Sequence, residues 1–169
     1  MRHTITILVE NEFGVLTRIA GLFSARGYNI ESLNVAPTLD HTVSRMTLVT
    51  RGDEHVIEQI KKQLNKLIPV IKTEDISHKA HMEREMVLVK VRAEDAQRAE
   101  VLRMADVFRA KVVDVSARSY TLELTGKANK LDAFMRMLEP LGIIEMTRTG
   151  PVGMRRGEKG FVVDSEPSA

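Results

Sequence analysis

The sequence predicts an α+β protein made of two tandem βαββαβ units, each forming a four-stranded antiparallel sheet with two helices on one face. Three observations lead to this fold class. Apolar residues alternate with period two in some segments and follow helical spacing in others. The segments occur in the order β, α, β, β, α, β, and this order is then repeated along the chain. Right-handed crossovers place both helices of such a unit on one side of its sheet.

The first unit is expected over residues 1–77. Its first helix carries apolar residues at helical spacing and ends at Gly27, which occupies the C-terminal cap position. Asp53 can cap the second helix, and Pro69 stops it. The expected first helix covers residues 14–26, and the expected strands cover residues 4–9, 30–36, 44–51 and 70–76.

The second unit is expected over residues 86–157, after a charged linker over residues 78–85. Its expected strands cover residues 86–91, 111–115, 120–125 and 143–148, and its helices cover residues 96–108 and 130–141. The two units share a rhythm of elements without obvious residue identity. Residues 158–169 follow a segment rich in Gly, Pro and charge, and we expect them to form a disordered tail.

Composition narrows the functional classes. The chain has no cysteine, which removes disulfides, thiolate catalysis and Cys-ligated zinc. Its formal net charge is +2 and charges of both signs are interspersed, so no electrostatic footprint for nucleic acid or an anionic membrane is present. No stretch approaches the length of a membrane span, and the first apolar run is too short for a signal peptide. We therefore expect a cytoplasmic protein.

The two turns that flank the first helix carry the strongest functional signal. Gly14 opens the helix, where unpaired N–H groups and the positive end of the helix dipole favour a carboxylate or phosphate. Asn11 and Asn29 each add a side-chain amide that both donates and accepts. Neither turn contains His, Cys, Ser or Lys. The pattern predicts a site that binds a small anion-bearing ligand without transforming it.

Gly14 and Asn29 can share one small ligand only if two chains meet. The first helix spans roughly 20 Å at about 1.5 Å per residue, so the two residues lie at opposite ends of one chain. A two-fold dimer that pairs the first helices, or the edge strands at residues 30–36, would bring Gly14 of one chain to Asn29 of the other. The sequence therefore predicts a homodimer. Asn29 capping the turn after Gly27 remains an open alternative.

Two other groups of side chains have simpler interpretations. His78 and His81 have a spacing compatible with a metal ion, but they lie in a charged segment without a third ligand. We expect them to be a solvated pair and predict no metal site. Arg155 and Arg156 form a short basic pair that we also expect to be solvated.

Several stretches resemble the regulatory (small) subunit family of acetolactate synthase, also called acetohydroxyacid synthase. The longest are NEFGVLTR at residues 11–18 and GLFSARGYNIESL at residues 21–33. Shorter matches are SRMT at 44–47, RE at 84–85, VLVKV at 87–91, KLDAF at 130–134, Gly150, and RG at 156–157. The resemblance runs from about residue 2 to about residue 157 and includes both halves.

That resemblance implies a ferredoxin-like fold in both units, with an N-terminal ACT domain, which is an amino-acid-sensing module. It also implies a homodimer that binds valine, and in some members leucine or isoleucine, at the ACT–ACT interface. By matching positions, the effector-binding residues are Asn11, Gly14, Val15 and Leu16 from one chain with Asn29 and Ile30 from the other.

The resemblance further implies a catalytic large-subunit partner that carries thiamine diphosphate, magnesium and FAD. This chain would then be non-catalytic and without a cofactor of its own. It would activate the partner and confer allosteric feedback inhibition in branched-chain amino-acid biosynthesis. Many ACT domains outside this family have Asp and Pro where this chain has Asn11 and Phe13. Phe13 can narrow or cover the pocket, which bears on effector affinity.

Three other functions share the topology. An acylphosphatase-type enzyme needs a cationic phosphate clamp in the first turn, which instead offers Glu10 and Glu12. An RNA-binding sheet needs exposed aromatic residues on its central strands, and residues 4–9 and 44–51 contain none. A free-standing ACT sensor that regulates another enzyme or a transcription pathway shares the ligand site and differs in its partner. The family matches in the second half argue against this last alternative.

Overall fold

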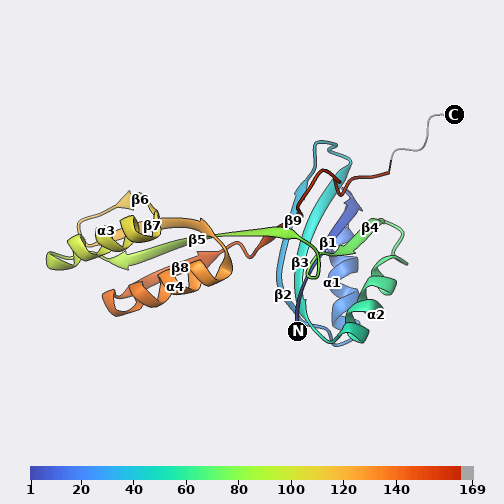
Figure 1. Cartoon of the computed structure of the whole chain (residues 1–169), viewed down its shortest axis with the longest axis horizontal. Coiled ribbons are helices and arrows are strands. Elements are labelled where there is room, and N and C mark those ends of the chain that lie inside the picture. Colours follow the sequence, from blue (N-terminus) through green and yellow to red (C-terminus); the bar gives the residue numbers. More distant parts are fainter. Residues whose placement is uncertain (165–169) are drawn as a thin grey trace. The chain divides into compact units, whose positions relative to one another are not determined.

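The computed structural model describes residues 1–164 of the chain, which form two compact units. The first unit contains residues 1–82 together with 152–164, and the second contains residues 83–151. The first unit is built from β1 (Arg2–Glu10), α1 (Val15–Ala25), β2 (Ile30–Pro37), β3 (Val43–Arg51), α2 (Glu54–Leu64) and β4 (Val70–Asp75) (Figure 1). The predicted βαββαβ order is confirmed.

The first sheet has the strand order β2-β3-β1-β4, and α1 and α2 cover one of its faces (Figure 1). Its central strand β1 pairs antiparallel with β3 from Arg2 opposite Arg51 to Glu10 opposite Val43. The helix-facing core joins alternate residues of β1 and β3 to the apolar stripes of both helices. Its fully buried members include Ile5, Ile7, Ile19, Phe23, Met46, Leu48, Ile57, Ile60 and Leu64.

The second unit repeats this plan with its own core. Its elements are β5 (His81–Arg92), α3 (Ala96–Phe108), β6 (Lys111–Val115), β7 (Ser119–Gly126), α4 (Ala128–Leu138), the 3₁₀ turn η1 (Glu139–Leu141) and β8 (Ile143–Arg148). The strand order is β6-β7-β5-β8, with the short strand β9 (Val152–Arg155) pairing β5 off this path. The core consists mainly of Val87, Val89, Val91, Val101, Leu122, Leu124, Leu131, Phe134 and Leu138. The predicted α+β class with two ferredoxin-like sheets is therefore confirmed.

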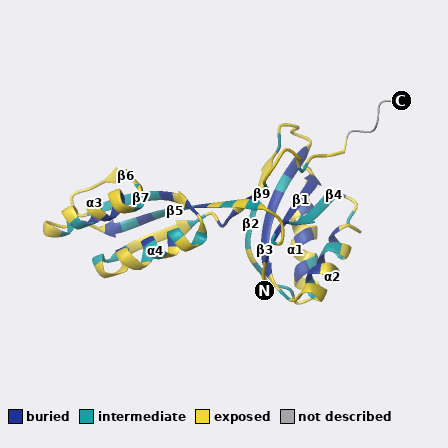
Figure 2. Ribbon diagram, viewed as in Figure 1, coloured by how far each residue is buried: buried dark blue, intermediate teal, exposed yellow. Residues whose placement is uncertain are grey.

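Strand β1 is buried on both faces of its sheet, because every residue from position 3 to position 9 is buried (Figure 2). The helices cover only one face. Residues 152–164 contribute to the other: the Gly153 N–H donates to Thr47 Oγ1 at 3.3 Å, and Arg45 Nη2 donates to the Gly153 carbonyl at 2.9 Å. A Cβ at Gly153 would lie only 2.7 Å from Cδ1 of Ile76, so the absence of a side chain permits this close approach.

This C-terminal segment departs from the expected boundaries. The sequence placed residues 152–157 in the second unit and residues 158–169 in a disordered tail, whereas residues 152–164 belong to the first unit. The Phe161 ring centroid lies 5.4 Å from Arg45 Cζ and 5.9 Å from Lys72 Nζ, and Lys72 Nζ pairs with Asp164 Oδ1 at 2.9 Å. Cation–π and charge contacts thus fix a stretch that lacks strand periodicity. Residues 165–169 lie outside the described part of the chain.

The expected linker is also shorter than the sequence indicated, since β5 already begins at His81. The Arg156 N–H donates to the Ala80 carbonyl at 2.8 Å, which gives this stretch a backbone partner that only the fold provides. No helix within residues 1–164 has the length and apolar character needed to cross a membrane.

Candidate functional site

Gly14 forms the N-terminal cap of α1 in a left-handed conformation, with φ 81° and ψ −3°. The first internal hydrogen bond of the helix runs from the Arg18 N–H to the Gly14 carbonyl at 2.9 Å, and no side chain caps the helix. A Cβ placed on Gly14 would meet no atom within 4 Å. The backbone conformation therefore favours glycine here, and the space before the helix terminus is open to a ligand.

Asn11 is held in place by the turn between β2 and β3. Its N–H donates to the Thr42 carbonyl at 2.7 Å, and its Nδ2 donates to the His41 carbonyl at 2.8 Å. That turn is itself closed by Asp40 Oδ1, which accepts from Thr42 Oγ1 at 2.7 Å and from the Thr42 N–H at 2.9 Å. These bonds lower the pKa of the Asp40 carboxyl. The Nδ2 bond to His41 orients the side chain, and Oδ1 is its atom that can accept from a ligand.

The apolar residues around Gly14 differ in exposure. Val15 is buried in the core under α1, so only its main chain faces the turn. Leu16 is 45% exposed and can contact a ligand with its side chain. Phe13 is fully exposed and does not cover the turn within one chain.

Asn29 and Ile30 lie beyond the other end of α1. The helix ends in a tight turn in which Gly27 has φ 69° and the Tyr28 N–H donates to the Phe23 carbonyl at 2.9 Å. The Asn29 carbonyl accepts a 2.6 Å hydrogen bond from Thr50 Oγ1, and the residue itself is exposed. Ile30 is half-buried and begins the edge strand β2.

The structure thus divides the six expected effector-binding residues into two groups. Asn11, Gly14, Val15 and Leu16 surround the start of α1, while Asn29 and Ile30 lie past its end. The helix has eleven residues, which corresponds to about 16 Å. Within one chain, the two groups are too far apart to hold one small ligand.

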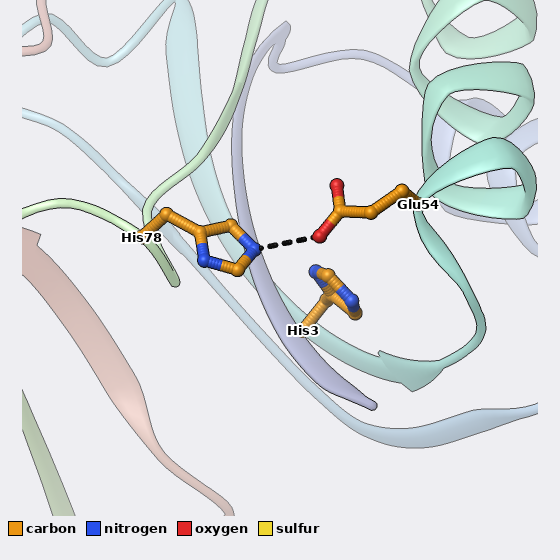
Figure 3. Close-up of side chains that lie close together, drawn as sticks. All are labelled: His3, Glu54 and His78. Carbon is orange, nitrogen blue, oxygen red and sulfur yellow. Dashed lines mark ion pairs between the residues drawn. The ribbon is translucent and has the colours of Figure 1, made fainter.

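A second cluster lies elsewhere in the first unit. His3, Glu54 and His78 have ligand atoms that all lie within 4.8 Å of one another (Figure 3). His78 was expected to pair with His81 as a solvated residue. It is instead 3.0 Å from Glu54 Oε1, while His81 Nδ1 lies 2.7 Å from the Lys79 carbonyl. Sequence spacing gave no signal for this cluster, because its members are far apart along the chain.

The βαββαβ unit with its open, glycine-capped helix terminus is joined to a second unit of the same topology, which defines the chain as a tandem ferredoxin-like protein. Comparison with family models matches the AHAS small subunit-like ACT domain over residues 5–72. It also matches the small subunit of acetolactate synthase over residues 84–157. The chain belongs to the acetolactate synthase small-subunit family, as its sequence motifs predicted.

Full-length relatives agree with this assignment. The acetolactate synthase isozyme 3 small subunit of Salmonella typhimurium is 51% identical over 94% of this chain and 98% of its own length. The acetolactate synthase small subunit of Haemophilus influenzae is 49% identical over 96% of this chain and all of its own length. The crystal structure of the Thermotoga maritima small subunit superposes with a TM-score of 0.87 at 37% identity, covering 94% of this chain and 99% of that one.

Proposed function

We propose that this chain is a non-catalytic regulatory subunit that binds valine between the ACT domains of a homodimer and controls an acetolactate synthase catalytic subunit. Leucine and isoleucine are expected as overlapping effectors. The observation that carries the proposal is the uncapped start of α1, opened by left-handed Gly14 and flanked by Asn11.

The start of α1 has the chemistry that an amino-acid effector needs. Free N–H groups at the helix terminus can donate to its carboxylate, and the helix dipole contributes about 0.3–1 kcal/mol. Oδ1 of Asn11 and the side chain of Asn29 can accept from its ammonium group. Leu16 and Ile30 supply apolar surface for its side chain. A methylene difference is worth only about 1–3 kcal/mol, so the three branched-chain amino acids are separated weakly.

The edge strand β2 supports the dimer in this proposal. It lies at the edge of the sheet, and within residues 1–164 β3 is the one strand that neighbours it in the sheet. Val35 on β2 and Leu39 in the following turn are 47% and 103% exposed, and Phe13 is fully exposed beside Gly14. Pairing of this region around a two-fold axis would bury these side chains and bring Asn29 of one chain to the Gly14 turn of its partner.

A ligand that contacts both chains changes the relative stability of different dimer geometries. The effector thereby couples to any partner that binds one geometry better than another. In this proposal the partner is the catalytic large subunit, which carries thiamine diphosphate, magnesium and FAD. A free-standing ACT sensor is less well supported, because residues 84–157 match the acetolactate synthase small subunit outside the ACT domain.

Reconstitution tests the proposal directly. The purified chain is mixed with an acetolactate synthase catalytic subunit, and acetolactate formation is measured with and without valine. We expect the chain to raise activity and valine to lower it again. Absence of both stimulation and valine sensitivity would contradict the proposed function.

A single substitution separates sensing from activation. Asn29→Ala removes one partner of the effector ammonium and should relieve valine inhibition while activation is retained. The control is Asn129→Ala, which changes an exposed asparagine on α4 in the second unit. Equal valine sensitivity of the two variants would show that Asn29 does not contribute to the effector site.

A further inference from the structure

The His3, Glu54 and His78 side chains converge from three separate elements of the first unit (Figure 3). His3 lies on β1, Glu54 is the first residue of α2, and His78 lies in the segment between β4 and β5. His78 Nε2 is 3.0 Å from Glu54 Oε1, and the rings of His3 and His78 meet edge to face with centroids 5.6 Å apart.

His3 has an unsatisfied nitrogen that points to a missing partner. The residue is 0% exposed, and its Nδ1 lies 2.8 Å from Asp75 Oδ2. Its other ring nitrogen, Nε2, is buried and has no hydrogen-bond partner among the described residues. Buried polar atoms in folded proteins are normally paired, so an orphaned imidazole nitrogen beside a second imidazole and a carboxylate requires an explanation.

Asp75 orients His3 in the way that carboxylates orient metal-binding histidines. Its Oδ1 accepts from the Ser77 N–H at 2.9 Å and from Ser77 Oγ at 2.6 Å, which leaves Oδ2 for His3 Nδ1. With Asp75 Oδ2 as the partner of Nδ1, Nε2 is the ring nitrogen that remains for the cluster.

We propose that His3, His78 and Glu54 bind a divalent transition-metal ion of the zinc class, with Asp75 positioning His3 and a water completing the coordination. Two imidazoles and one carboxylate suit Zn²⁺ better than Mg²⁺ or Ca²⁺, which prefer oxygen ligands. The carboxylates of Glu54 and Asp75 together balance the charge of a dication.

The distances allow this assignment with a small adjustment. Bonds of about 2.0–2.2 Å to a tetrahedral zinc ion place two ligand atoms about 3.3–3.6 Å apart, and the ligand atoms of the cluster all lie within 4.8 Å of one another. The side chains of His78 and Glu54 are 54% and 66% exposed, so they are free to rotate toward the fixed Nε2 of His3. The ion would join the segment after β4 to β1 and to the start of α2, and so stabilise the first unit.

Metal titration of the full-length chain tests the proposal. The protein is stripped with a chelator, and Zn²⁺ binding is followed by calorimetry together with the thermal midpoint. We expect saturable binding of one ion per chain and a higher midpoint with Zn²⁺. Co²⁺ as a spectroscopic probe should give the visible absorption of a nitrogen- and oxygen-ligated site.

Variants identify the ligands. His78→Gln and Glu54→Gln should each weaken Zn²⁺ binding at least about tenfold, and Asp75→Asn should weaken it by about 10–100-fold. The matched controls are His81→Gln and Glu58→Gln, which remove a neighbouring histidine and the next carboxylate on α2, and they should bind as the unchanged chain does. Substitution of the fully buried His3 would also affect folding, so the test uses variants of the exposed ligands. Absence of saturable binding, or equal affinity in His78→Gln, Glu54→Gln and the controls, would overturn the proposal.

Discussion

Single residues determine the backbone geometry at the proposed effector site and the stability of both units. Gly14 is needed for its left-handed backbone rather than for space, since a Cβ there would meet nothing within 4 Å. A side chain at this position would strain the local backbone without meeting a neighbouring atom, and it would occupy the space proposed for the ligand. Substitutions at Gly14 can therefore change ligand binding without disrupting the core.

Two substitutions that differ in charge test whether the Gly14 turn binds an anion. Gly14→Asp places a carboxylate where the effector carboxylate binds, while Gly14→Asn adds a neutral side chain of similar size. Both residues tolerate positive φ better than other side chains do. We expect Gly14→Asp to bind valine at least about tenfold more weakly than Gly14→Asn, because each factor of ten corresponds to about 1.4 kcal/mol. Calorimetry measures the valine affinity of both variants. Equal affinities would argue against binding of the valine carboxylate at this helix terminus.

In the second unit, Arg148 on β8 holds the buried carboxylate of Glu85 on β5. Arg148 Nη2 and Nε lie 2.8 and 2.9 Å from the two Glu85 oxygens, and Nη1 lies 2.8 Å from Asp132 Oδ1. Glu85 is only 7% exposed, and its hydrogen bonds are the main cause that raises the pKa of Arg148. Removing the cation would leave a buried, unpaired carboxylate.

Arg148→Ala should therefore destabilise the second unit by about 2–3 kcal/mol. This loss is somewhat smaller than the loss from breaking a fully buried ion pair, because Arg148 is partly exposed. The control is Arg103→Ala, which breaks a similar two-bond pair with Glu100 on the exposed side of α3. Denaturant unfolding monitored by circular dichroism compares the two. A similarly small decrease in the free energy of unfolding of both variants would show that water or other groups solvate the Glu85 carboxylate when Arg148 is removed.

Residue-level prediction from the sequence succeeded where the signal was local. Gly14 lies at the start of α1 as expected, and Gly27 has the positive φ that its position after the helix implied. Contacts between distant segments gave no such signal. The pairing of His3 with Asp75 joins positions 72 residues apart, and nothing in the spacing of either residue indicates it.

At the scale of elements, hydrophobic periodicity was sufficient for the strands and helices of both βαββαβ units. It failed for β9 and the residues after it, because this segment is held by polar and cation–π contacts rather than by an apolar stripe. Because β1 is buried on both faces, another element must cover the face of the sheet opposite the helices. The alternation of threonine and isoleucine, followed by an apolar run, indicates a buried strand but not which segment covers its second face.

Gly153 is the point at which β9 can be tested. Gly153→Ala would place a Cβ 2.7 Å from Cδ1 of fully buried Ile76, and we expect a loss of about 1–3 kcal/mol in the first unit. In the control Gly160→Ala, the new atom meets Cγ1 of Val162 at 3.3 Å, and that side chain is exposed and able to move. Hydrogen exchange of the β1 and β3 amides localises the effect. Unchanged protection in Gly153→Ala would mean that β9 does not stabilise this sheet.

At the scale of the whole molecule, the chain has two units with separate cores, and the proposed effector site belongs to neither chain of the dimer alone. The two groups of effector-binding residues are separated by the length of α1, which the helical spacing of the sequence already indicated. The dimer itself leaves no periodic signal in a sequence. The proposed dimer is supported by the edge strand β2, which the sequence already placed at residues 30–36, and by exposed apolar side chains that only the folded chain reveals.

Mixed dimers test this shared site most directly. Gly14→Asp and Asn29→Ala homodimers should each lose valine binding, because every site then contains one altered residue. In a mixed dimer, both changes fall in one site and the other site is intact. Random exchange of subunits at equal amounts should therefore restore roughly a quarter of the unaltered binding capacity, since half of the dimers are mixed. No recovery of valine binding after subunit exchange would contradict a site built from two chains.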